Sequence, residues 1–130
     1  MHELRVGDDV LRARVAAREL ARADGLGVMD QTRFATAVSE LARNAVRYGR
    51  DGRCTFSDLG DARQHRLQAQ VSDQGPGIAD LALAMQDGYS TGGSLGAGLP
   101  GARRLVDVFD IRSSPAGTVV TVQIVRPRRP

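Results

Sequence analysis

The sequence contains no lysine and no tryptophan, one cysteine and only two histidines. Without lysine the chain can be neither a P-loop NTPase nor a Schiff-base enzyme, because both depend on a lysine amine. Cys54 has no second cysteine with which to form an internal disulfide, and His2 and His65 are too few to complete a zinc cluster with it. We therefore expect Cys54 to be a small buried residue.

Aromatic residues are also scarce, and charges of the two signs nearly cancel. Eighteen arginines oppose fifteen acidic residues, which gives a formal net charge of +3. Arg126, Arg128 and Arg129 lie in the last five residues, so the rest of the chain is neutral and has no long basic stripe. With two tyrosines and three phenylalanines as the only rings available for base stacking, we expect no nucleic-acid partner.

No apolar run approaches the ~20 residues that a helix needs to span a bilayer. The longest such run is Leu81–Met85. The N-terminal stretch MHELRVGDDVLRARV carries a charge every few positions and so lacks the apolar centre of a signal peptide. We therefore expect a cytoplasmic protein that does not enter a membrane.

A length of 130 residues fits one domain. We expect a single domain over residues 1–125, followed by a disordered Arg/Pro tail over residues 126–130. Apolar residues at steps of three and four predict helices, the clearest of them capped by Asp30, and alternating apolar residues predict strands. The expected helices cover residues 9–24, 30–48, 78–86 and 99–108, and the expected strands cover residues 3–6, 54–59, 66–71, 111–114 and 118–125.

These elements predict the fold class. Helices and hairpin-like strand pairs are segregated along the chain, which is typical of an α+β two-layer sandwich. The strand–helix alternation of a doubly wound fold is missing. The glycine-dense stretch over residues 88–101 is therefore not a Rossmann fingerprint, since it follows a loop rather than a strand and lacks a later ribose-binding acid.

Glu40 and Asn44 lie four residues apart on the clearest predicted helix, so both project from one face. A carboxylate in this position can polarise a hydroxyl or a water as a general base. A carboxamide is a neutral oxygen ligand for a hard cation such as Mg2+. A solvated helix face would account for the same pair, so the spacing alone does not assign a function.

Two glycine-rich segments and a Gly-Thr pair complete the candidate site. The segment D-Q-G-P-G at 73–77 follows a predicted strand; its carboxylate can accept a hydrogen bond from an exocyclic amine, and its glycines allow close backbone approach. An ordinary turn explains the same composition. Residues 89–101 lead into a helix whose N-terminal amides favour phosphate oxygens, with a flexible linker as the alternative. Gly117 and Thr118 start the last predicted strand, where threonine is common.

The order and spacing of these segments resemble the boxes of the GHKL ATPase superfamily, which includes DNA gyrase, MutL, histidine kinases and small anti-sigma-type serine kinases. The matching boxes are E-L-A-R-N at 40–44, D-Q-G-P-G at 73–77, L-G-A-G-L-P-G at 95–101 and G-T at 117–118. Together they extend over most of the chain, from about Asp30 to Ile124. The stretches M-Q-D-G-Y-S-T at 85–91 and L-G-A-G-L-P-G-A-R-R-L-V-D at 95–107 are most similar to RsbT-type switch kinases of the bacterial stressosome, which are related to anti-sigma factor kinases.

The resemblance implies a Bergerat fold, in which helices cover one face of a mixed sheet and ATP lies between the helices and a lid. It implies a protein serine/threonine kinase that uses ATP and Mg2+ and phosphorylates STAS-domain proteins. Its released form would activate a PPM-type phosphatase in a stress-signalling partner switch. The residues agree with this chemistry, because phosphoryl transfer needs positioning and charge neutralisation more than a covalent intermediate. A homodimer is left open.

The resemblance also implies roles for single residues. Glu40 resembles the catalytic base of the family, Asn44 its Mg2+ ligand, and Asp73 the carboxylate that receives the adenine amino group. Arg103 stands where relatives often have lysine and can bind a phosphate with two parallel hydrogen bonds. The remaining implied ATP-binding residues are Gly75 and Gly77 beside the base and ribose, Gly96, Ala97, Gly98 and Leu99 in the lid, and Thr118 near adenine.

Two other functions are alternatives to the kinase. A nucleotide-dependent anti-sigma or regulator-binding protein would bind ATP with little or no transfer; the presence of Glu40 favours the kinase, since a non-polar residue there would have favoured the binding protein. An ATPase fragment of the gyrase class is disfavoured by the short length and by the lack of a transducer domain.

Overall fold

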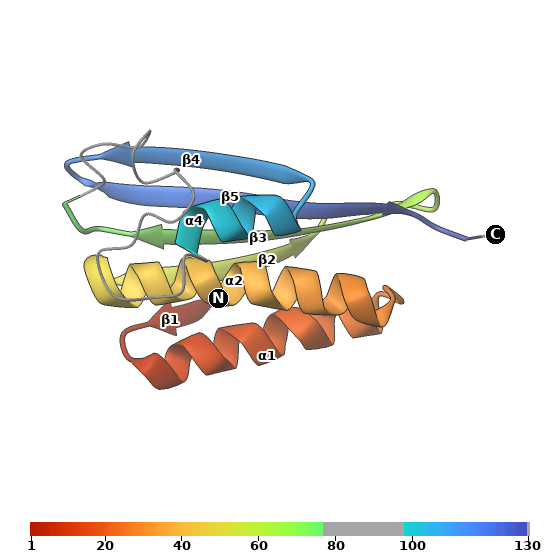
Figure 1. Ribbon diagram of the computed structural model, residues 1–130, viewed down its shortest axis with the longest axis horizontal. Helices are drawn as coiled ribbons and strands as arrows, with labels where there is room; N and C mark the ends of the chain where they lie inside the picture. The colour runs from red at the N-terminus through yellow and green to blue at the C-terminus, as the bar shows by residue number, and fades with distance from the viewer. Residues whose placement is uncertain (77–97, 130) are drawn as a thin grey trace.

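The computed structural model describes residues 1–76 and 98–129 (Figure 1). Five strands form one sheet in the order β1-β2-β3-β5-β4, and all four pairings are antiparallel. The elements in chain order are β1 (His2–Leu4), α1 (Gly7–Ala23), α2 (Val28–Tyr48), β2 (Gly52–Asp58), β3 (Gln64–Asp73), α4 (Gly98–Leu105), β4 (Val108–Ser114) and β5 (Gly117–Pro127).

This architecture confirms the α+β class and corrects several details. The sheet was expected to be mixed, but every pairing among the described residues is antiparallel. Asp30 does not cap α2, because the helix begins one turn earlier, after Gly27. The last helix ends at Leu105 instead of residue 108, since the ladder with β5 already starts at Val108. The helix expected over 78–86 lies outside the described residues.

The core lies between the sheet and α2. Strands β3 and β5 place apolar side chains on the same face in directly opposed pairs: Leu67 with Ile124, Ala69 with Val122, and Val71 with Val120. Helix α2 packs its buried stripe against them, and that stripe consists of Phe34, Val38, Leu41 and Ala45. Because the apolar period of α2 matches the helical repeat, the packing fixes which face of the helix turns toward the sheet.

The other two helices lie on the same side as α2. Helix α1 packs against α2 through buried Ala13, Ala17 and Ala21, whose small side chains at every fourth position allow a close approach. Helix α4 also contacts α2 (Figure 1). The opposite face of the sheet is polar, with Gln123 hydrogen bonded to Gln68 at 2.8 Å. The expected two-layer arrangement, with helices on one face, is therefore confirmed.

Cys54 is fully buried in β2, as expected for a free cysteine. Burial raises the pKa of its thiol to about 12. The thiol therefore stays protonated at neutral pH and is a poor nucleophile. Among the described residues no helix is both long and apolar enough to cross a membrane.

The C-terminal residues are paired, so the prediction of a disordered tail from residue 126 is wrong for the described part. Arg126 and Pro127 extend β5 opposite His65 and Gln64. The Arg126 guanidinium bridges Asp30 of α2 at 3.1 Å and Asp107 at 2.8 Å. Three arginines in five residues suggested a solvated tail, but two of them have specific acidic partners that are far away in the sequence.

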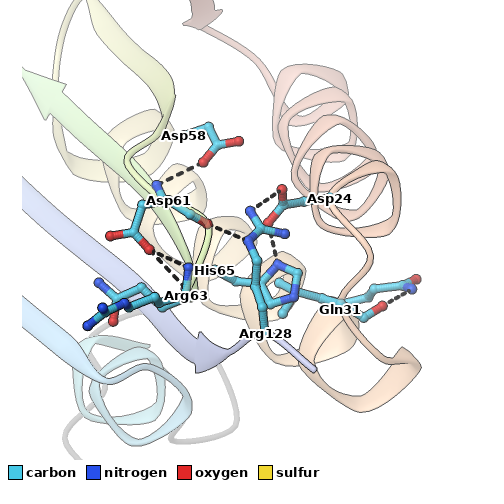
Figure 2. A network of polar contacts seen from close by, with 10 residues as sticks. Asp24, Gln31, Asp58, Asp61, Arg63, His65 and Arg128 are labelled. Atoms are coloured by element: carbon cyan, nitrogen blue, oxygen red, sulfur yellow. Dashed lines mark hydrogen bonds and ion pairs between the residues drawn. The ribbon is translucent and has the colours of Figure 1, made fainter. Parts of the chain in front are cut away.

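Arg128 belongs to a second polar network at the same end of the molecule (Figure 2). Its Nε donates to the backbone oxygen of Asp61 at 2.6 Å, and its Nη2 lies 3.3 Å from Asp24 Oδ1. Asp24 also lies 2.6 Å from Nδ1 of His65, and both side chains are 11 % exposed. The network thus joins the end of α1, the start of β3 and the C-terminal strand.

Burial disfavours the ionised form of Asp24, but hydrogen bonds from His65 and Arg128 outweigh that penalty and hold its pKa below the ordinary value of 3.8. A carboxyl whose pKa is lowered by folding stabilises the native state above its unfolded pKa. This stabilisation is lost as the pH falls through the lower, folded pKa.

We expect Asp24→Asn to lower the free energy of unfolding by about 1–3 kcal/mol at pH 7, because it removes a charged acceptor from the buried His65 and the partly exposed Arg128. The deficit should stay constant down to about pH 5 and shrink below the unfolded pKa of Asp24, at about pH 4. Urea unfolding at a series of pH values measures it. The matched control is Asp110→Asn, because Asp110 pairs with Arg112 at the surface. Equal deficits for both variants would contradict the role of the network.

Candidate functional site

Helix α2 carries the first half of the site. Glu40 is buried, with 7 % of its surface exposed, and its Oε1 accepts a hydrogen bond from Arg43 Nη1 at 2.9 Å. Asn44 lies one turn further on and is half-buried. The expected placement of Glu40 and Asn44 on one helix face is therefore found, and the burial of Glu40 distinguishes the pair from an ordinary solvated face.

The end of β3 carries the second half. Asp73 is half-buried, and its Oδ1 accepts a hydrogen bond from the backbone N–H of Gly75 at 2.8 Å. The next residue, Gln74, donates its backbone N–H to the carbonyl of Arg50 at 2.7 Å. That bond ties the end of β3 to the turn that follows α2, so the backbone next to Asp73 is fixed beside that turn.

Three glycines make room for Asp73. A Cβ atom added at Gly49 would lie 2.4 Å from Cγ of Asp73, and one at Gly75 would lie 2.7 Å from the Cα of Gly49. Gly117 has a φ of +148°, and a Cβ there would lie 2.0 Å from the Asp73 carbonyl oxygen. Such distances exclude any side chain at these positions without movement of the backbone or of Asp73. The glycines therefore let three segments converge on one carboxylate.

Thr118 completes this end of the site. It lies directly opposite Asp73 in the β3–β5 ladder and is 8 % exposed. Its Oγ1 lies 3.0 Å from Oγ of Ser113 on β4. A carboxylate and a hydroxyl from neighbouring strands are therefore side by side, which provides an acceptor and a group that can both donate and accept.

Helix α4 contributes its first residues. Gly98 starts the helix with a φ of +39°, Leu99 is buried, and Arg103 is exposed to solvent. The helix packs against α2, the element that bears Glu40 and Asn44. Of the other predicted site residues, Gly77, Gly96 and Ala97 lie outside the described residues.

The two halves are separated along α2. From Glu40 to its last residue, Tyr48, the helix rises by about 12 Å at 1.5 Å per residue, and the next residue, Gly49, abuts Asp73. The arrangement therefore suits an elongated ligand, with a hydrogen-bonding group at the Asp73 end and a charged, reactive group at the Glu40 end.

Two residues of this arrangement were missed by the sequence analysis. Arg43 pairs with Glu40 at a spacing of three residues, which is the spacing of ion pairs on a helix and could have been noticed. Gly49 was interpreted only as the end of a helix. Its contact with Asp73 joins residues 24 positions apart, and no local pattern in the sequence indicates it.

Comparison with known proteins identifies the family. The family described as "Histidine kinase-like ATPase domain" matches residues 7–124. A Bacillus subtilis (strain 168) protein, "Serine/threonine-protein kinase RsbT", is 42 % identical over 118 residues, which cover 91 % of this chain and 88 % of the relative.

Solved structures share the fold. The RsbU and RsbW domains of a Mycobacterium tuberculosis protein superpose with a TM-score of 0.69 at 23 % identity; the match covers all of this chain, which spans 32 % of that longer one. The mycobacterial sensor histidine kinase MprB superposes with a TM-score of 0.57 at 20 % identity over 95 % of this chain and 96 % of the other. The family match over residues 7–124 and the 42 % identical relative show that the chain belongs to the histidine kinase-like ATPase domain family, of GHKL type.

Proposed function

We propose that this protein is an ATP-dependent protein serine/threonine kinase of a bacterial stress-signalling partner switch. The observation that carries the proposal is the buried Glu40, which stands one turn from Asn44 on the helix that ends against Asp73. The 42 % identity to a serine/threonine-protein kinase over most of both chains supports the same activity.

The Asp73 end suits adenine. The Asp73 carboxylate accepts one hydrogen bond from Gly75 N–H and retains further lone pairs for the exocyclic amine of the base. Thr118 lies opposite it on β5 and can contact the same edge of the ring. Since both groups are held by backbone pairing, the recognition geometry exists before the nucleotide binds.

The residues present fit a Mg2+ ion that is held mostly by the nucleotide. No group of three His, Cys, Asp or Glu side chains that could hold a metal occurs in residues 1–76 and 98–129. Asn44 offers one neutral oxygen, and Mg2+ commonly takes one or two protein ligands together with phosphate oxygens and water. When bound, the ion would neutralise charge on the phosphates.

Glu40 then acts as the base. The hydroxyl oxygen of a substrate serine or threonine forms a bond to the γ-phosphorus, and the bond from that phosphorus to the bridging oxygen of ADP breaks. Glu40 accepts the hydroxyl proton as the new bond forms. Arg103 on α4 is the candidate for binding a phosphate, because it follows the predicted lid in the sequence. Its side chain is exposed and can turn toward a phosphate.

The substrates we propose are STAS-domain proteins, with a PPM-type phosphatase as the target of the released kinase. These partners follow from the similarity to RsbT-type switch kinases. If the chain instead binds ATP and a STAS-domain protein without transferring phosphate, it is a nucleotide-dependent regulator of the anti-sigma kind.

We expect Glu40→Gln to lower the rate of phosphate transfer to a STAS-domain protein from the same gene cluster by at least about 100-fold, the usual contribution of a general base. ATP affinity should stay within about twofold, because the amide keeps an acceptor for Arg43. Radiolabel transfer and fluorescent ATP-analogue binding measure the two. Glu19→Gln, an exposed glutamate paired with Arg22 on α1, is the matched control. Unchanged transfer in Glu40→Gln would assign the base elsewhere.

We expect Asp73→Asn to weaken ATP binding by about 10- to 100-fold, since a hydrogen bond to a charged group contributes about 1.5–3 kcal/mol. Equilibrium binding of a fluorescent ATP analogue measures this, with Asp110→Asn as a surface control. ATP affinity that survives the change would refute the assignment of Asp73 to the base.

Gly49→Ala should weaken ATP binding about tenfold while the protein stays folded, because the new Cβ displaces the Asp73 side chain by overlap at 2.4 Å. Gly7→Ala is the matched control, since a Cβ at Gly7 meets nothing within 4 Å. Circular dichroism establishes folding for both variants. A Gly49→Ala protein with normal affinity would show that the position of Asp73 does not govern binding.

A further inference from the structure

A groove lies between α1 and α2, on the side of α2 that faces α1. Its volume is about 450 Å³, and four residues from each helix line it. The first turns of α1 and the second half of α2 form its walls, where the two helices run side by side (Figure 1). The lining residues that matter here are Arg14, Arg43, Arg47, Val10, Leu11 and Val46.

The chemistry of this groove is basic and apolar. Three of its eight lining residues are arginines, and none is acidic. Val10 and Val46 are half-buried, whereas Leu11 is 58 % exposed, which is high for a large apolar side chain. Such a lining is complementary to a segment that combines carboxylates with one apolar side chain.

Arg43 belongs both to this groove and to the reactive end of the site. Its guanidinium donates to Glu40 at 2.9 Å, while 46 % of its own side chain remains exposed. The Glu40 side chain is only 10 % exposed. A group that enters the groove therefore reaches the ion-pair partner of the buried glutamate from the α1 side of α2.

We propose that the groove docks an acidic segment of the substrate protein and that Arg43 couples this docking to Glu40. The inference rests on the kinase function proposed above and adds a partner surface and a positioning residue to it. In the free protein, Arg43 donates to Oε1 of Glu40 and occupies the oxygen that would receive the substrate proton. A docked carboxylate competes for Arg43 and releases the Glu40 carboxylate to accept the substrate proton.

The exchange of partners moves only the half-exposed member of the pair, since the Arg43 side chain is 46 % exposed and its charge is already partly solvated. The buried Glu40 carboxylate loses its cation, which is costly unless a proton replaces it, and the substrate hydroxyl supplies that proton. Arg14 and Arg47 remain to hold the docked segment when Arg43 turns. Without substrate, the same pairing keeps Glu40 from activating water. An activated water would attack the γ-phosphorus, the bond from that phosphorus to ADP would break, and Glu40 would accept the proton of the water.

The proposed docking of the substrate protein in the groove is tested by binding alone, without phosphate transfer. Affinity for the STAS-domain protein is measured by calorimetry with a non-hydrolysable ATP analogue present. We expect Arg14→Glu/Arg47→Glu to lose at least tenfold in affinity. The matched control, Arg18→Glu/Arg33→Glu, changes the same charge at exposed positions of the same helices outside the groove, and should lose less than twofold. Arg14→Gln/Arg47→Gln repeats the test with a milder change if the first variant misfolds.

The proposed coupling of Arg43 to Glu40 is tested by ATP hydrolysis with and without the substrate protein. We expect Arg43→Gln to raise substrate-free hydrolysis several-fold and to abolish its further stimulation, whereas Arg43→Lys restores most of the restraint. If Arg43 only held the Glu40 side chain in position, Arg43→Gln would instead lower the rate of ATP hydrolysis both with and without the substrate protein.

Either of two results would overturn the inference: equal affinities in the groove and control variants, or a fall of both rates in Arg43→Gln. No binding of the STAS-domain protein by the unaltered chain would overturn it together with the proposed substrate class. Normal groove-dependent binding without any transfer would instead contradict the kinase function and leave the docking surface supported.

Discussion

The close approach of three backbone segments around Asp73 is the constraint on which the site depends. The end of α2, the end of β3 and the start of β5 meet there, and glycines at 49, 75 and 117 allow the contact. A side chain at any of them would move either the carboxylate or the backbone. Because the same junction ends α2, it also sets where Glu40 and Asn44 stand relative to Asp73.

Helix α2 thus has three roles on three faces. Its apolar stripe packs on the sheet and fixes its orientation. A second face presents the buried Glu40 and half-buried Asn44 to the site. A third face, with Arg43 and Arg47, forms one wall of the groove against α1. The Arg43–Glu40 pair connects the last two faces, so the groove and the candidate base share one contact.

Much of the fold could be predicted because it follows local rules. The periodicity of α2 and the alternation of Leu67, Ala69 and Val71 identified the helix, the strand and their buried faces. The candidate residues were found because their boxes occur in a characteristic order. The structure brings Asp73 beside Thr118 by strand register, and it shows Glu40 to be buried.

What the sequence did not predict depends on contacts between distant residues. Arg126 and Arg128 looked like a solvated tail, yet Asp30, Asp107 and Asp24 pair with them from 19 to 104 positions away. Gly49 acts on Asp73 across a separation that no periodicity reveals. The sequence also did not predict that all described strand pairs are antiparallel. The local alternation of apolar and polar residues is the same in parallel and antiparallel pairs.

The central claim is that this chain transfers the γ-phosphate of ATP to a protein hydroxyl. The most direct test incubates the chain with γ-labelled ATP, Mg2+ and a STAS-domain protein encoded beside it, and then identifies the labelled residue by mass spectrometry. We predict label on one serine or threonine of the STAS-domain protein, in proportion to the ADP formed. A STAS-domain protein that binds in the presence of ATP but never acquires label would contradict the claim.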